Sequence, residues 1–179
     1  KAALEQTKYG GMSFPDFKEE MIHYIKLHYG KGCSILDVGA GDGAYGKLLN
    51  KYSEIDAVEY YKPYIDHFQL DKIYNKVYNN DICKFEFDYY DVIIIGDVLE
   101  HIAVKDAQKL LDYMYDRADE IFVAVPYNYV QGEVHGNEKQ AHLQLDLTHE
   151  IFLERYPRFK EFARNERYGV YIKDGGKNV

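Results

Sequence analysis

The stretch ILDVGAGDGAYG, residues 35–46, constrains the fold of this chain more than any other segment. The apolar run CSILDV indicates a buried strand, and four glycines then fall within eight positions. A helical pattern follows in AYGKLLNKY. Glycine permits a tight turn with positive φ and lets a ligand lie against bare backbone, close to the N–H groups that open the next helix. The stretch therefore predicts a strand–loop–helix unit that holds a nucleotide-like ligand.

Strand and helix patterns alternate along the rest of the chain. Further strands are expected in IDAVEY (55–60), YNKVYNND (74–81), YDVIIIGD (90–97) and EIFVAVP (120–126), and two more in FKEFARN (159–165) and YGVYIKD (168–174). Helical spacing follows Pro15, Pro63 and Ala107, and another helix is expected near 148–156. These patterns predict a doubly wound, Rossmann-like α/β fold. Its seven-stranded sheet is mostly parallel, with an antiparallel C-terminal hairpin and helices on both faces.

The length of 179 residues suggests one domain, over 15–175, between tails at 1–14 and 176–179. Within it we expect a cofactor half over about 33–126 and a substrate loop over about 127–147. The formal net charge of −8 argues against nucleic acid and anionic membrane as partners. The two cysteines fit no disulfide or zinc pattern, and no run has the length of a membrane span or the core of a signal peptide. We therefore expect a cytoplasmic protein; the sequence gives no oligomeric state.

Carboxylates follow the first three predicted strands. Asp37 ends the first, Glu59 ends the second, and Asp81 ends the third. Glu59 can accept hydrogen bonds from both ribose hydroxyls, and Asp81 can accept one from an adenine amino group. The spacing Gly39-x-Gly41-x-x-Ala44 also satisfies the dinucleotide fingerprint. Asp37 disfavours that interpretation, because a carboxylate there would repel pyrophosphate but suit a positively charged sulfonium.

The order Asp37-Val-Gly-Ala-Gly-Asp-Gly, then Glu59, Asp81 and GDVLEHI resembles class I S-adenosylmethionine-dependent methyltransferases. The motifs cover about 33–126, and the strand pattern extends the resemblance to 175. It implies S-adenosylmethionine as the cofactor, with ribose at Glu59 and adenine at Asp81. The cofactor-binding residues that it implies are Asp37, Gly39, Ala40, Gly41, Gly43, Glu59, Tyr60, Asp81, Ile82, Gly96, Asp97 and Val98.

The methyl acceptor is expected to be a small molecule, methylated at oxygen. The Asn/Asp-Pro-Pro-Tyr segment of many nitrogen methylators is replaced here by GDVLEH. The segment from Pro126 onward resembles the P…GN…H segment of methyltransferases in glycan and secondary-metabolite pathways. Two alternatives are a non-catalytic module that binds the cofactor, and a nicotinamide-dependent oxidoreductase, which Asp37 and the short chain disfavour.

Three histidines are candidates for a catalytic base: His101 after the fourth strand, and His135 and His142 in the substrate loop. Tyr127, Asn128 and Tyr129 open this loop and are candidate substrate-binding residues. The loop is expected to close over the acceptor. In the alternative interpretation, His101 packs or caps a helix and the loop histidines are structural.

No metal is expected to be needed, because no ligand spacing of a dedicated site occurs. The alternative is a site built from Glu133, His135, His142 and Asp146, which all belong to the substrate loop.

Overall fold

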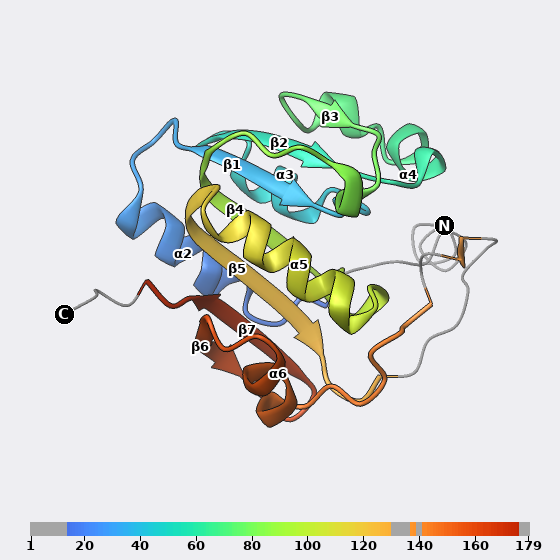
Figure 1. Ribbon diagram of the computed structural model, residues 1–179. Helices are drawn as coiled ribbons and strands as arrows, with labels where there is room; N and C mark the ends of the chain where they lie inside the picture. Colours follow the sequence, from blue (N-terminus) through green and yellow to red (C-terminus); the bar gives the residue numbers. More distant parts are fainter. Residues whose placement is uncertain (1–13, 130–136, 139–140, 176–179) are drawn as a thin grey trace.

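A seven-stranded sheet runs through the middle of the molecule (Figure 1). The computed structural model describes residues 14–129, 137–138 and 141–175. The order of strands across the sheet is β3-β2-β1-β4-β5-β7-β6, and β7 runs antiparallel to both of its neighbours, whereas the other pairs are parallel. This confirms the predicted fold class. The strands are β1 (Ser34–Val38), β2 (Glu54–Val58), β3 (Val77–Tyr78), β4 (Tyr90–Gly96), β5 (Ala118–Pro126), β6 (Phe159–Arg164) and β7 (Tyr168–Lys173).

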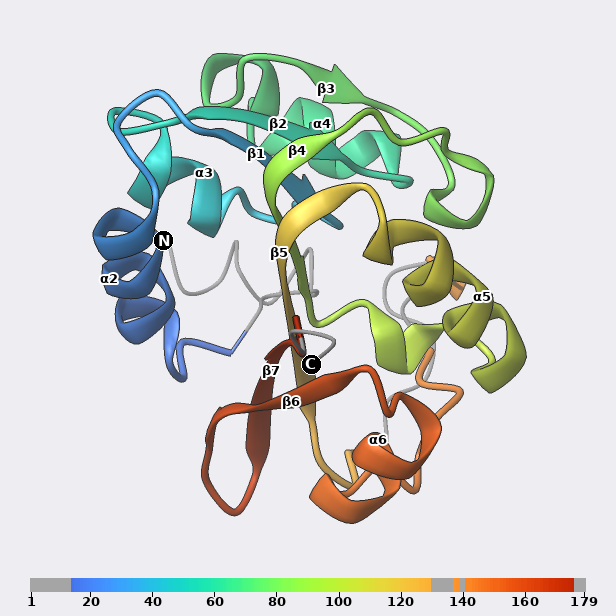
Figure 2. The ribbon, with the colours of Figure 1, turned by 60° about the vertical axis from the view of Figure 1, so that its left-hand side comes forward.

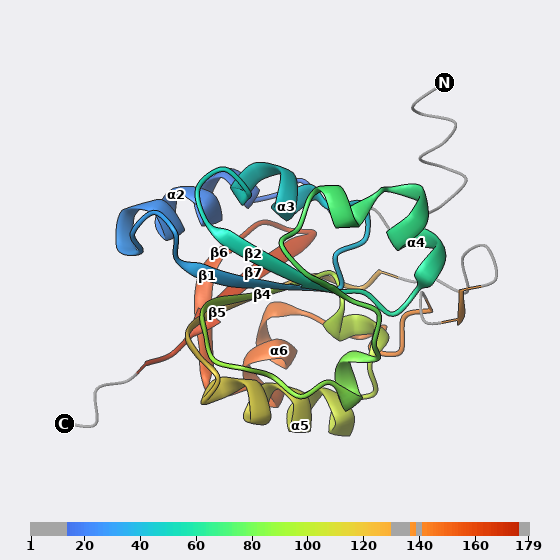
Figure 3. The same ribbon diagram turned by 90° about the horizontal axis from the view of Figure 1, so that it is seen from above.

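Helices cover both faces of the sheet (Figure 3). On one face lie α2 (Lys18–His28), α3 (Ala44–Leu49) and α4 (Lys62–His67), and on the other lie α5 (Val104–Tyr115) and α6 (His149–Arg155).

Side chains of β4 alternate between the two layers that the helices form with the sheet. Val92 and Ile94 pack in the same core as α2 and α3, whereas Ile93 and Ile95 pack in the core that contains α5. The unbroken apolar run of β4 follows from this position, because a central parallel strand is buried on both faces.

The parallel strands end along one edge of the sheet. The hydrogen-bonded register brings Val38 beside Val58 and Ile95, and Gly96 beside Ala124. The loops that leave these strand ends therefore meet, as the binding edge of an open α/β sheet requires. The β6–β7 hairpin lies at the opposite side of the sheet from β3, together with α6 (Figure 2).

Phe14 and Asp16, which precede α2, contact distant parts of the molecule, and Phe14 is the one residue of the predicted tail 1–14 that the structure describes. The backbone N–H of Phe14 donates to Asp97 (3.0 Å), and Arg167 Nη2 donates to Asp16 (2.6 Å). Residues 1–13 and 176–179 of the two expected tails lie outside the described residues. Within the described ranges, the helices lack the length and apolar character needed to cross a membrane.

Gly46 in α3 provides a test of this packing. A Cβ there would lie 2.5 Å from Cζ of Tyr74, whose hydroxyl accepts a hydrogen bond from the Gly46 N–H (3.2 Å). We expect Gly46→Ala to lower the free energy of unfolding by about 1–3 kcal/mol, in spite of the better helix propensity of alanine. Denaturant unfolding measures the change. Gly30→Ala is the control, because its Cβ would meet nothing within 4 Å. Equal losses in the two variants would contradict the prediction.

Candidate active site

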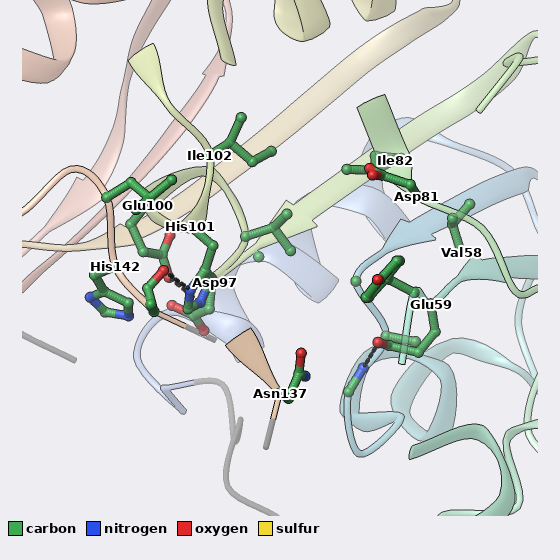
Figure 4. A pocket seen from close by; sticks show the side chains of 18 of the residues that line it. Val58, Glu59, Asp81, Ile82, Asp97, Glu100, His101, Ile102, Asn137 and His142 are labelled. Carbon is green, nitrogen blue, oxygen red and sulfur yellow. Dashed lines mark hydrogen bonds and ion pairs between the residues drawn. The ribbon is translucent and has the colours of Figure 1, made fainter. Parts of the chain in front are cut away.

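A cavity of about 1060 Å³ opens at the carboxyl edge of the sheet. Residues that follow β1, β2, β3, β4 and β5 line it, together with Phe14. Polar side chains stand in two groups on opposite sides of this cavity (Figure 4). The first group consists of Glu59 and Asp81, and the second consists of Asp97, Glu100, His101 and His142.

The glycine loop after β1 forms one wall of this cavity. Gly39 has a φ of +73°, and a Cβ there would lie 2.2 Å from Cγ2 of Val98, so only glycine fits. The N–H groups of Gly39 and Ala40 donate to the carbonyl of Val58, at 2.8 and 3.3 Å. Gly39, Ala40 and Gly41, which we predict to bind the cofactor, line the cavity. The backbone of β2 thus holds the loop in a shape that leaves the peptide groups accessible to a ligand.

Glu59 holds the same loop through its side chain. The carboxylate is 7% exposed and accepts hydrogen bonds from the N–H of Gly41 (2.9 Å) and the N–H of Tyr61 (3.0 Å). Burial raises the pKa of Glu59, and these backbone hydrogen bonds oppose the rise. A carboxylate has about four acceptor positions, so the group retains capacity for a ligand hydroxyl.

Asp81, Ile82 and Tyr60 also line the cavity. Asp81 caps a short 3₁₀ turn (Ile82–Lys84), where its Oδ1 accepts from the N–H of Cys83 at 3.0 Å. The carboxylate therefore begins the turn that places Ile82 at the cavity wall.

Asp37 and Gly43 do not line the cavity, although we expected both to contact the cofactor. The Asp37 carboxylate is 2% exposed and accepts a 2.5 Å hydrogen bond from the hydroxyl of Tyr74. Burial raises its pKa to about 7, against the lowering effects of Tyr74 and Lys18. A Cβ at Gly43 would meet side chains, the nearest being Ile73 at 2.9 Å. Both residues therefore lie on the side of the loop that packs against the protein, where their neighbours are Ile73 and Tyr74.

The residues at the end of β4 and directly after it also line the cavity, and we predict that they bind the cofactor: Gly96, Asp97 and Val98. Asp97 has a φ of +56°, uncommon for a residue other than glycine. Its Oδ2 accepts the hydrogen bond from Phe14, which brings that aromatic ring to the cavity wall. Sequence reasoning missed Phe14, since only the tertiary contact with Asp97 brings it there.

Two of the three predicted histidines meet at the cavity. The rings of His101 and His142 lie 4.6 Å apart, centroid to centroid, in an edge-to-face arrangement. His101 Nδ1 lies 3.1 Å from the carbonyl oxygen of Ala141, and His142 Nδ1 lies 2.7 Å from that of Tyr129. Burial lowers the pKa of His142. His135 lies outside the described residues.

Glu100 is a site residue that sequence reasoning missed. Its side chain is 2% exposed, and Oε1 lies 3.5 Å from Nε2 of His101. Burial, reinforced by the charge of Asp97, raises the pKa of Glu100 well above its usual range. The available signal was the acidic residue directly before His101 in GDVLEHI.

Of the three candidate substrate-binding residues, only Tyr129 lines the cavity. The Tyr127 hydroxyl lies 2.6 Å from that of Tyr171, and a Cβ at Gly169 would meet it at 1.9 Å, so Tyr127 is part of the packing. The Asn128 N–H donates to the carbonyl of Leu147. Most of the predicted substrate loop, 130–136 and 139–140, lies outside the described residues, as does the closure expected of it.

The alternative metal set from this loop is not assembled in the part of the chain that the structure describes. Glu133 and His135 lie outside it. The Asp146 side chain is 60% exposed and pairs with Arg155 at 2.5 Å. The hydrogen bond from Arg155 lowers the pKa of Asp146.

The charge of the cavity wall suits a cationic nucleoside. Among the described lining residues there are one lysine, Lys84, and no arginine. A pyrophosphate would be repelled by this wall, whereas a ligand with a sulfonium, an ammonium group and ribose hydroxyls finds acceptors. The residues present therefore fit S-adenosylmethionine. The acidic lining residues are Asp42, Glu59, Asp81, Asp97, Glu100, Asp106 and Glu138.

Comparison with known proteins supports a class I S-adenosylmethionine-dependent methyltransferase, in agreement with the fold and the cavity. Residues 36–117 match the family described as methyltransferase domain. This segment runs from β1 past the end of α5 and contains all of the predicted cofactor residues. The chain is thus an enzyme that uses S-adenosylmethionine, and neither the non-catalytic module nor the nicotinamide-dependent oxidoreductase is supported.

Solved structures share the fold at low sequence identity. A S-adenosylmethionine-dependent methyltransferase from Clostridium acetobutylicum has a TM-score of 0.70 at 11% identity, covering 98% of this chain and 97% of that one. The N-terminal domain of EvdMO1 with S-adenosylhomocysteine has 0.67 at 14%, covering 90% and 82%. The 1,6-didemethyltoxoflavin-N1-methyltransferase of Burkholderia thailandensis has 0.65 at 15%, covering 86% and 76%. No curated protein matches the chain in sequence.

The buried Asp37 should make stability depend on pH. Its pKa is about 7 in the folded chain against an ordinary 3.8, so its contribution is complete below about pH 4 and is lost as pH rises through 7. At about 1.4 kcal/mol per pKa unit, the loss is at most about 4 kcal/mol. Asp37→Asn keeps an acceptor for Tyr74 without the charge. We measure the free energy of unfolding of both proteins by denaturant at pH 4 to 8. As pH rises, we expect the value for Asp37→Asn to increase relative to that of the wild type. Parallel pH profiles of the two proteins would contradict the prediction.

Proposed function

We propose that this methyltransferase transfers a methyl group to a hydroxyl oxygen of a small molecule. The observation that carries the proposal is the histidine pair, His101 and His142, on the cavity wall next to Asp97. A hydroxyl must lose its proton as it attacks carbon, and imidazole groups close to the transferred methyl can promote that loss. Nitrogen acceptors with a lone pair need no such group.

The cofactor is expected to lie with its adenosine between Glu59 and Asp81 and its methionine part against Gly96–Val98. Support comes from the positions of Glu59 and Asp81 on one side of the cavity and of Asp97 on the other (Figure 4). The electrophilic methyl would then point toward His101 and His142. S-Adenosylmethionine supplies the methyl carbon as a good electrophile, so the chain's own task is to align the acceptor and exclude water.

A small acceptor is favoured by charge and by size. The net charge of −8 and the acidic cavity wall disfavour a nucleic acid. The cavity volume of about 1060 Å³ is close to the upper end of the range usual for ligand pockets, which leaves room for a cofactor and a small acceptor together. The similar enzyme of Burkholderia thailandensis holds the small heterocycle 1,6-didemethyltoxoflavin. We expect the acceptor to belong to glycan or secondary-metabolite biosynthesis. This expectation rests on the segment from Pro126 to His142, which resembles the P…GN…H segment of methyltransferases in those pathways.

The reaction balances without an oxidant or reductant. The acceptor oxygen forms a bond to the methyl carbon while the carbon–sulfur bond breaks, and the electron pair of that bond stays on sulfur. The hydroxyl proton leaves to solvent or to a side chain. The products are the methyl ether and S-adenosylhomocysteine.

Glu59→Gln tests the position of the cofactor. Both oxygens of Glu59 accept a backbone N–H, so an amide would turn an NH₂ group toward one of these donors. We expect S-adenosylhomocysteine to bind about 10- to 150-fold more weakly, the loss of roughly 1.5–3 kcal/mol typical of a hydrogen bond to a charged group. Calorimetry measures the affinity. The matched control is Glu54→Gln, at the exposed start of the same strand. Unchanged affinity in a folded Glu59→Gln variant would show that Glu59 does not bind the cofactor.

An acceptor screen tests the reaction. The enzyme is incubated with labelled S-adenosylmethionine and sets of alcohols, phenols, sugars and amines, and products are located by mass spectrometry and NMR. We expect O-methyl products, and turnover reduced about 10²–10⁴-fold in His101→Ala and His142→Ala, with cofactor affinity unchanged. His135→Ala belongs in the same series, and His23→Ala, an exposed residue of α2, is the control. Methylation confined to nitrogen, or full turnover in all three variants, would contradict the proposal.

A further inference from the structure

Three potential metal ligands converge at one side of the cavity. Glu100 and His101 belong to the 3₁₀ turn after β4 (Leu99–His101), and His142 comes from the segment that returns from β5 toward α6. One ligand atom from each residue lies within 4.8 Å of the other two. Figure 4 shows the three side chains gathered next to Asp97. Ligands bonded at about 2.0–2.2 Å on opposite sides of an ion would be roughly 4.2 Å apart, so small side-chain rotations suffice.

Backbone carbonyls fix the same tautomer in both histidines. A carbonyl oxygen only accepts, so Nδ1 of His101 donates to Ala141, and Nδ1 of His142 donates to Tyr129. In a neutral imidazole with a proton on Nδ1, the lone pair lies on Nε2. Metal-binding histidines in proteins are commonly oriented in this way, with the second nitrogen donating to a carbonyl or carboxylate.

The Glu100 side chain is buried and incompletely hydrogen-bonded. Its Oε1 faces Nε2 of His101 at 3.5 Å. When Glu100 is ionised, both atoms are acceptors in the tautomer set by Ala141. Its Oε2 is buried and has no hydrogen-bond partner among the described residues. Within the described part of the chain, His101 is also its only ion-pair partner within 4.0 Å. A buried carboxylate is costly unless it is paired or coordinates a metal.

Backbone contacts hold the two segments of the cluster together. The N–H groups of Leu143 and Gln144 donate to the carbonyl of Glu100, at 2.8 and 3.1 Å. The side-chain amide of Gln144, which is 3% exposed, donates to the carbonyls of Leu99 (2.9 Å) and Ile102 (2.8 Å). The segment that carries His142 is therefore fixed against the turn that carries the other two ligands. A preorganised site of this kind binds a metal without first having to order its ligands.

We propose that Glu100, His101 and His142 bind one divalent transition-metal cation, through the carboxylate and the Nε2 atoms of the two imidazoles. Two imidazoles and one carboxylate suit manganese, iron, cobalt or zinc better than magnesium or calcium, which prefer oxygen ligands. Three protein ligands leave coordination positions open toward the cavity, as in catalytic metal sites.

The open positions give the cation a role in the reaction, and this step rests on the proposed function. A cation held there would lower the pKa of an acceptor hydroxyl by Lewis-acid polarisation. The hydroxyl proton would pass to solvent while the oxygen forms its bond to the methyl carbon and the carbon–sulfur bond breaks toward sulfur. The histidines then act by holding the cation. This set differs from the one considered from the sequence, and it replaces our expectation that no metal is needed.

Direct binding to the untagged full chain is the first test. After chelation and dialysis, calorimetry with MnCl₂ and ZnCl₂, and electron paramagnetic resonance of Mn²⁺, should show one ion per chain. Asparagine places its amide nitrogen close to the position of Nδ1, so His101→Asn and His142→Asn can keep the bonds to Ala141 and Tyr129 and lose only Nε2. We expect at least tenfold weaker binding in each, and in Glu100→Gln, with His23→Ala unchanged.

Several outcomes overturn the inference. Absence of saturable binding does so, and so does binding that both asparagine variants retain at full affinity. Circular dichroism and thermal unfolding without metal show whether each variant is folded; should one variant fail to fold, the other two decide.

Activity separates this inference from the proposed function. Loss of O-methylation on chelation and its return with Mn²⁺ would support both. Metal binding that follows the variants, without methylation of any hydroxyl, would support the metal site and contradict oxygen methylation. O-Methylation that survives chelation, in a protein that binds no cation, would support the function and overturn the metal site.

Discussion

The hydrogen bonds between the loop after β1 and the end of β2 are the constraint on which the site depends. Val58 accepts two N–H groups of the loop, and the buried Glu59 carboxylate accepts a third from Gly41. Burying a carboxylate costs free energy unless hydrogen bonds compensate, and here the loop and Tyr61 supply them. The end of β2 consequently holds the loop in the shape that binds the cofactor. Glu59 has two roles there, because it fixes the loop and is also expected to bind the ribose.

Much of the fold followed from local patterns, because a buried strand such as YDVIIIGD and an amphipathic helix leave clear periodicities. The glycines and strand-end acids also indicated the cofactor correctly. The directions in which side chains point were harder to predict from the sequence. Asp37 stands next to the loop in sequence, yet its carboxylate faces Tyr74, which is distant in sequence and whose position only packing determines. Phe14 and Glu100 were missed for the same reason, since their positions at the cavity depend on contacts between distant segments.

Polar groups on the two sides of the cavity differ in how they are satisfied. Glu59 is bonded at both oxygens by backbone donors, so its charge is compensated within the fold. Glu100 is equally buried, but one of its oxygens has no partner among the described residues and the other faces an imidazole nitrogen. Folded proteins rarely leave such groups without a purpose, because each lowers stability. The charge of the first carboxylate is thus compensated before any ligand binds, whereas the second has hydrogen-bonding capacity that only a ligand can satisfy.

Asp37 couples the cofactor to the proton content of the protein. Burial raises the pKa of Asp37 to about 7, so its carboxyl can gain or lose a proton near neutral pH. A cation bound against the other side of the loop favours the ionised carboxylate, so its arrival expels a fraction of a proton into the medium. The heat of cofactor binding then depends on the buffer that takes up that proton. The sulfonium carries one more positive charge than the thioether left after transfer, so the protein takes part of the proton back within each catalytic cycle.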